Sequence, residues 1–237
     1  MVLIPNLFHL LFLFLLSGLG EFPDPLPRSE KPRKETKETT IYTLVVIIYL
    51  TLDIFFFRRF IHFLYIVLGF SSIIFLLIPF FYTRYRDHWT SKDLGVISKI
   101  KAPSIVIASV IFYTYFGYAN TLTAIIPWYL LLIYFYSNAF FEEFLFRGVI
   151  QSKLERAIGQ KRALIFQAFA FMAFHVPVNI FNYFLDGNLL RLFSAFGLQL
   201  INGAIYGLIF MKTRNLWISV ICHYLNNWLG AIITLFL

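Results

Sequence analysis

Long apolar runs dominate this sequence and decide what it can fold into. From Ile41 to Tyr82 the chain is interrupted only by Asp53 and by the pair Arg58 and Arg59. At a helical rise of about 1.5 Å per residue, such a run crosses the roughly 30 Å hydrocarbon core of a bilayer twice. Of the 237 residues, 59% are hydrophobic and only 14% are charged, whereas a soluble domain typically has about 25% charged residues. The sequence therefore predicts an all-α, polytopic membrane protein whose fold comes from helix-to-helix packing.

About eight transmembrane helices are expected from the apolar segments. They cover residues 2–20, 41–57, 60–82, 104–119, 125–152, 162–178, 190–211 and 215–236. Residues 1–20 could be a retained span or a signal peptide, and the missing basic residues and cleavage site favour a retained span. Residues 21–40 carry four prolines and five acids against five bases. Such a segment cannot bury enough apolar surface to order itself, so we expect a polar linker there. Residues 41–103 form the next unit, with two helices and a basic loop.

The distribution of basic residues predicts the orientation in the membrane. They gather in three loops, namely residues 83–103, Lys153 to Arg162, and Lys212 with Arg214. The intervening loops near residues 120–126 and 178–189 carry almost no positive charge, so the basic loops are expected in the cytoplasm. The net charge of +8 is thereby attributed to topology, and no nucleic-acid partner is expected.

Ionisable residues inside the apolar segments point to a functional site. Such residues are found in the hydrocarbon core only when they form ion pairs, contact water or take part in function. Glu142, Glu143 and Arg147 share one segment, and His175 and His223 lie in two later ones. Counted from the basic face at helical rise, Glu142, His175 and His223 lie roughly 15, 20 and 13 Å deep. Since polar residues normally face the interior of the bundle, we expect the three segments to meet at one site.

Helical spacing suggests how these residues are oriented. Residues four apart share a helix face, so Glu143 should pair with Arg147, which leaves Glu142 turned toward another neighbour. His223 and Asn227 have the same spacing and should present an imidazole and an amide to one place.

Three motifs follow one another along the chain, namely Glu142-Glu143-x-x-x-Arg147, Phe171-x-x-x-His175 and His223-x-x-x-Asn227. In this order they resemble the CAAX-protease and bacteriocin-processing (CPBP, Abi-type) family of intramembrane endopeptidases. The flanks Phe146 to Gln151 and Gly203 to Gly207 are also similar, and the two glycines suggest a close helix-packing face. The resemblance covers about residues 120–230, so residues 104–237 are expected to form the catalytic core.

The resemblance implies hydrolysis of peptide bonds within the membrane, and the depths counted from the basic loops indicate a position near the cytoplasmic side. Carried over to this sequence, Glu142 and His175 would activate the attacking water, a general-base role. His223 and Asn227 would stabilise the oxyanion. Glu143 and Arg147 would support the architecture.

Substrate and cofactor are less closely defined. The resemblance implies either prenylated proteins, which lose a C-terminal tripeptide, or small secreted peptides, processed next to membrane lipid. No cofactor is expected, because the His-Glu-x-x-His spacing of zinc proteases is absent and the single Cys222 excludes a multi-cysteine metal cluster. Zinc held by Glu142, His175 and His223 remains the alternative.

Two other functional classes stay open. Intramembrane Glu, His and Arg also form relays in transporters, although the clustering of these residues in the cytoplasmic half disfavours a path from face to face. A non-catalytic immunity or scaffold protein could keep the same fold. We expect the cell membrane as the location, with the endoplasmic reticulum membrane as the alternative.

Overall fold

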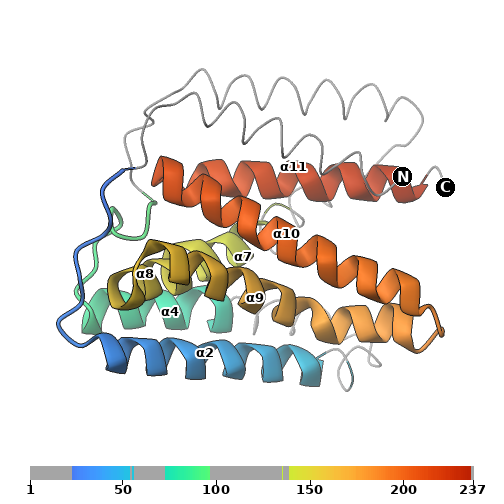
Figure 1. The fold of residues 1–237 in the computed structure, drawn as a ribbon, viewed down its shortest axis with the longest axis horizontal. Coiled ribbons are helices and arrows are strands. Elements are labelled where there is room, and N and C mark those ends of the chain that lie inside the picture. Colours follow the sequence, from blue (N-terminus) through green and yellow to red (C-terminus); the bar gives the residue numbers. More distant parts are fainter. Residues whose placement is uncertain (1–22, 54, 56–72, 97–134, 136–138, 236–237) are drawn as a thin grey trace.

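The computed structural model describes residues 23–53, 55, 73–96, 135 and 139–235. Every regular element in these ranges is helical (Figure 1), which confirms the all-α class for the part of the chain that is described. The expected spans 2–20 and 104–119 lie outside the described residues. The total of about eight helices therefore stays a prediction.

The helix that carries both glutamates runs without a break through three elements. They are α7 (Phe141–Glu143), η6 (Phe144–Gln151) and α8 (Ser152–Ile158). The central element η6 is a π-helical segment, a wider helix with i→i+5 hydrogen bonds that is frequent at functional sites.

The basic loop expected from Lys153 to Arg162 is largely absent. The helix continues to Ile158, and only Gly159, at a φ of 89°, separates it from the next helix. The charged side chains remain in the helix because partners from other elements neutralise them. Arg156 pairs with Asp93 at 2.6 Å, and Lys153 pairs with Asp87.

Two long helical stretches follow. The first joins α9 (Gln160–Asn179) to η7 (Ile180–Phe184), and the second is α10 (Leu189–Thr213). In the described ranges these two stretches, of 25 residues each, are long and apolar enough to cross a membrane. The last helix, α11 (Leu216–Leu235), follows the short turn after α10, and Figure 1 shows α9, α10 and α11 as successive layers.

Helix α2 (Pro32–Leu52), the first helix in the described ranges, begins inside the segment predicted to be a polar linker. Proline at the start of a helix has a suitable φ and needs no backbone donor. The chain before it is held by α8: the Leu26 amide donates to Oε1 of Glu155 at 3.0 Å, and the Ser29 amide donates to the Arg156 carbonyl at 3.0 Å. Contacts with other elements thus order a segment that has no apolar core of its own.

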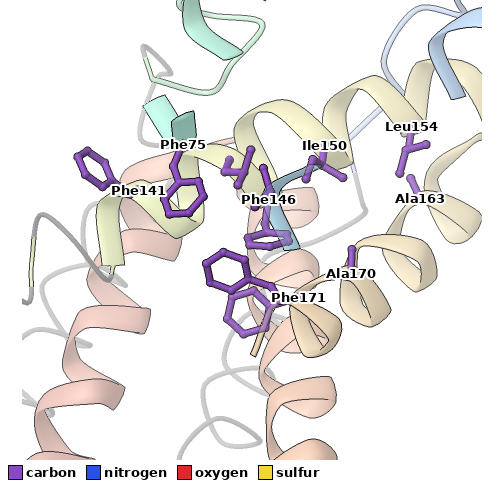
Figure 2. Packing of buried hydrophobic residues seen from close by; sticks show 11 residues of the cluster. Phe75, Phe141, Phe146, Ile150, Leu154, Ala163, Ala170 and Phe171 are labelled. Carbon is purple, nitrogen blue, oxygen red and sulfur yellow. The ribbon is translucent and has the colours of Figure 1, made fainter. Parts of the chain in front are cut away.

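A cluster of aromatic side chains joins these helices at their centre. Figure 2 shows Phe75 from η3 (Ile73–Leu77), Phe146 from η6 and Phe171 from α9 packed together. The ring centroids of Phe146 and Phe171 lie 5.1 Å apart in an edge-to-face arrangement. The short helix α4 (Ile78–Phe81) and η4 (Tyr82–Arg86) continue from η3 toward the segment that carries Asp87 and Asp93. In a bilayer such close van der Waals packing is what holds helices together, and here it joins the helix of Glu142 to α9, which carries His175.

Candidate active site

Three helices bring Glu142, His175 and His223 to one place. Oε2 of Glu142 in α7 lies 3.6 Å from Nε2 of His175 in α9 and 3.9 Å from Nε2 of His223 in α11. The three side chains are 13%, 15% and 5% exposed. The structure therefore brings His175 and His223, which follow Glu142 by 33 and 81 positions in the sequence, to the same place. Their catalytic roles remain a prediction.

The carboxylate of Glu142 is turned toward both imidazoles without a direct hydrogen bond to either. Among the described residues, its buried Oε2 atom has no hydrogen-bond partner. Separations of 3.6 and 3.9 Å exceed the usual N–H···O range of about 2.7–3.2 Å. Polar groups at such separations are commonly bridged by a water molecule. The arrangement can thus position a small polar molecule between an acid and an imidazole.

The backbone of α9 determines which nitrogen of His175 faces Glu142. Nδ1 of His175 lies 2.8 Å from the carbonyl oxygen of Phe171, one turn earlier. A carbonyl only accepts, so Nδ1 carries the hydrogen and donates it. In the neutral imidazole, Nε2 then keeps its lone pair. The side of His175 that faces Glu142 is therefore a proton acceptor.

Glu143 has two partners, of which helical spacing predicts one. Its Oε1 atom lies 3.1 Å from Nη1 of Arg147, which is the expected i,i+4 ion pair. The same oxygen lies 2.7 Å from Nδ1 of His223. Both Glu143 and Arg147 are fully buried. The contact with His223 joins helices 80 residues apart in sequence, and no local pattern indicates it.

Aromatic rings enclose Arg147 and His223 together. The Arg147 guanidinium lies 4.6 Å from the ring centre of Phe171 and 5.2 Å from that of Tyr206. The Tyr206 ring stacks on the His223 imidazole at 4.8 Å with an angle of 18° between the planes. A cation over an aromatic face is attracted by the ring quadrupole. These rings therefore hold the ion pair and the imidazole in fixed positions relative to each other. Sequence reasoning missed Tyr206, although it lies between the two glycines Gly203 and Gly207.

The expected glycine face on α10 is a site of close helix packing. A Cβ atom on Gly203 would lie 3.0 Å from Cα of Ala168 in α9, so the two backbones nearly touch. The Gly203 carbonyl accepts hydrogen bonds from Nη2 of Arg147 at 3.2 Å and from Nε2 of Gln167 at 2.7 Å. One turn later, the Gly207 carbonyl accepts from Nε2 of Gln151 at 3.0 Å. The glycines therefore expose backbone carbonyls that polar side chains of two other helices use.

Sequence reasoning assigned no site role to the two glutamines. Gln151 and Gln167 are both fully buried, and a buried amide in an apolar helix usually hydrogen-bonds across a helix interface. Their position in apolar segments of the sequence could have indicated that they form such hydrogen bonds between helices.

Asn227 is located only by its backbone. It lies in α11 one turn after His223, and its side chain lies outside the described part of the structure. Its expected role beside His223 stays a prediction.

The same three side chains were the candidate zinc ligands. In the described ranges, no group of three or more His, Cys, Asp or Glu side chains is arranged to hold a metal ion. Zinc held by these three residues stays an alternative, and the chemistry proposed below is derived from the side chains alone.

Comparison with known proteins adds one match. Residues 124–229 match the family model described as type II CAAX prenyl endopeptidase Rce1-like. The matched range includes every candidate site residue from Glu142 to Asn227. No curated protein and no solved structure matches the chain. The match confirms the resemblance drawn from the three motifs.

Proposed function

We propose that this membrane protein is an intramembrane endopeptidase that cleaves peptide bonds near the cytoplasmic side, because residues 124–229 match the family model of Rce1-like type II CAAX prenyl endopeptidases. The single observation that carries the proposal is the Glu142 carboxylate, which faces His175 at 3.6 Å and His223 at 3.9 Å.

Water activation relies on two acceptors, the carboxylate of Glu142 and the imidazole of His175, which face each other across the space between them. A water molecule between Oε2 of Glu142 and Nε2 of His175 donates one hydrogen to each. Both partners are acceptors, since Nδ1 of His175 already donates to the Phe171 carbonyl. As the water oxygen attacks the scissile carbonyl carbon, one proton passes to this acid–imidazole pair. The same pair then returns the proton to the departing amine, which completes hydrolysis without a cofactor.

The developing oxyanion requires donors on the other side of the carbonyl. Nδ1 of His223 is occupied by Glu143 at 2.7 Å, which leaves Nε2 toward Glu142 and the reacting atoms. When His223 is doubly protonated, Nδ1 donates to Glu143 and Nε2 donates to the oxyanion. Asn227, one turn along α11, supplies the second donor in this proposal. Donors fixed before the reaction stabilise the transition state by about 2.7–4 kcal/mol each.

The proposed substrate is the C-terminal tail of a prenylated protein, with a small secreted peptide as the second possibility. The family match implies a peptide or prenylated protein substrate. A lipid-anchored tail would approach through the bilayer and reach the three residues without leaving the membrane. We assign the protein to the cell membrane, with the endoplasmic reticulum membrane as the alternative.

The decisive experiment compares Glu142→Gln with the wild type in a peptide-cleavage assay on purified protein. Loss of the general base should lower kcat by about 10²–10⁴-fold, while circular dichroism and the unfolding temperature stay unchanged. Glu30→Gln removes an exposed carboxylate and should cleave at the wild-type rate. Unchanged cleavage by Glu142→Gln would exclude Glu142 as the base.

A further inference from the structure

A groove away from the candidate active site runs between α2 and α9. It has a volume of about 500 Å³. Apolar side chains of both helices form its walls, among them Leu44, Ile47, Ile165, Phe169 and Ala173. Three of these are about half exposed, with Leu44 at 53%, Ile165 at 58% and Phe169 at 52%. The groove therefore presents a continuous apolar surface on the outside of the described helices.

The walls offer almost no hydrogen bonds to a ligand. The polar side chains that line the groove are Thr40, Thr43 and Arg162. The hydroxyl of Thr40 donates to the Thr36 carbonyl at 2.9 Å, and that of Thr43 donates to the Thr39 carbonyl at 2.8 Å. Both hydroxyls are thus used within α2. Hydrocarbon is the chemistry that fits such walls.

One end of the groove is basic. Arg162, in the first turn of α9, lines the groove and is exposed. On α2, Lys37 lies one turn before Thr40, just beyond the residues that line the groove, and is also exposed. Neither side chain forms an ion pair with a described acidic residue. The two helices begin at the same face, because the chain just before α2 binds the end of α8 through the Ser29 amide and the Arg156 carbonyl. Both helices therefore carry a cation near this end of the groove, at the expected cytoplasmic surface.

The length of the groove matches one leaflet of a bilayer. From Arg162 to Ala173 the helix advances about 16 Å at 1.5 Å per residue. The hydrocarbon core of a bilayer is about 30 Å thick, so one leaflet contributes about 15 Å. An occupant with its head group at Arg162 would therefore end near the midplane.

We propose that this groove binds an anionic phospholipid of the cytoplasmic leaflet, with one acyl chain along α2 and α9 and the phosphate at Arg162. Basic residues between transmembrane helices on the cytoplasmic side attract anionic head groups, and the apolar walls accept the chain. The site is separate from the acid–imidazole cluster, so the proposal does not depend on proteolytic activity.

Lipid retention tests the proposal directly. Purified full-length protein is equilibrated with vesicles of phosphatidylcholine alone or mixed with phosphatidylglycerol, and bound lipid is measured by native mass spectrometry. The wild type should retain phosphatidylglycerol in preference to phosphatidylcholine. Arg162→Gln should weaken this retention about fivefold, which corresponds to the roughly 1 kcal/mol of one basic residue near the membrane surface.

Two further variants separate the groove from general surface charge. Lys161→Gln removes the neighbouring exposed charge, which does not line the groove, and should retain phosphatidylglycerol as the wild type does. Ala173→Leu narrows the deep end and should reduce retention of either lipid. Equal losses in Lys161→Gln and Arg162→Gln, equal retention of both lipids by the wild type, or a second copy of the chain in place of lipid would overturn the proposal.

Discussion

Nδ1 of His223 lies 2.7 Å from Oε1 of Glu143. The same carboxylate oxygen contacts Arg147 at 3.1 Å, and both members of that ion pair are fully buried. Glu143 thus links a structural cation to the imidazole that faces Glu142. One carboxylate holds the helix that carries the glutamates against α11 and orients a candidate catalytic side chain.

Glu143→Gln is therefore expected to destabilise the protein. The change leaves the buried Arg147 guanidinium without its counter-charge, and breaking a buried pair in this way costs about 3–5 kcal/mol. Unfolding in detergent, followed by circular dichroism, measures the loss. A wild-type unfolding temperature for this variant would contradict the role of the pair.

The double variant Glu143→Gln/Arg147→Met separates stability from orientation. Because neither buried charge is then left unpaired, most of the lost stability should return. Peptide cleavage should remain low, since His223 has lost its charged partner. Full recovery of cleavage would show that Glu143 acts only through Arg147.

Gly203→Ala should push α10 away from α9. The new Cβ would lie 3.0 Å from Cα and 3.1 Å from the carbonyl oxygen of Ala168, and backbone atoms cannot move aside cheaply. Overpacking of this kind costs about 1–3 kcal/mol. It also displaces the carbonyl that binds Arg147 and Gln167, so both stability and cleavage should fall.

Gly197→Ala is the matched control in the same helix. A Cβ atom there meets nothing within 4 Å, and Ala is favoured over Gly in a helix by about 0.5–1 kcal/mol. This variant should unfold at the same temperature as the wild type or slightly higher. Equal losses for the two variants would mean that close packing at Gly203 does not matter.

The Asp93 carboxylate should make stability depend on acid pH. Partial burial alone would raise the pKa of Asp93, but hydrogen bonds from Thr90 and the nearby Arg156 guanidinium outweigh it and lower the pKa. A lowered pKa in the folded state stabilises the protein above the unfolded value of about 3.9 and ceases to do so as the pH falls through the folded value.

Asp93→Asn should therefore cost about 0.5 kcal/mol at pH 7, a small amount because solvent screens this partly exposed pair. The difference between variant and wild type should shrink as the pH falls below about 4. Parallel unfolding measurements across this range provide the check. A difference that grows toward low pH would contradict the assignment.

Cleavage should survive removal of metal. Because the proposed mechanism uses Glu142 and His175 alone to activate water, exhaustive chelation and metal-free dialysis should leave kcat unchanged. The measurement is the cleavage rate before and after treatment, with and without added zinc. Loss of activity that zinc restores would replace the proposal with the zinc-dependent alternative.

Several features of the site could be predicted because they depend on short-range helix geometry. Residues four apart lie on one face of a helix, so the sequence was sufficient to predict the ion pair between Glu143 and Arg147. Intramembrane charge is costly, which made Glu142, His175 and His223 conspicuous. The boundaries of α10 agree within two residues with the apolar segment 190–211, since hydropathy is also a local property.

Other features were beyond local reasoning. Lys153 and Arg156 indicated a loop, yet both lie in a helix because Asp87 and Asp93 reach them from a distant segment. The start of α2 at Pro32 likewise depends on contacts of the preceding chain with α8. When the partners of charged residues are unknown, the sequence suggests that these residues lie in a solvent-exposed loop.

The sequence by itself determined the all-α class and the apolar character of the long helices. It also indicated which residues are too costly to bury without a purpose, and which of them share a helix face. Only the tertiary structure decided that His223 binds Glu143 and stacks on Tyr206, and that Glu142 lies between two imidazoles. The physical reason is that spacing within a helix follows from its fixed pitch. Contacts between helices depend on how far each is rotated about its axis and how closely the backbones approach, and here the approach of α10 to α9 at Gly203 sets that distance.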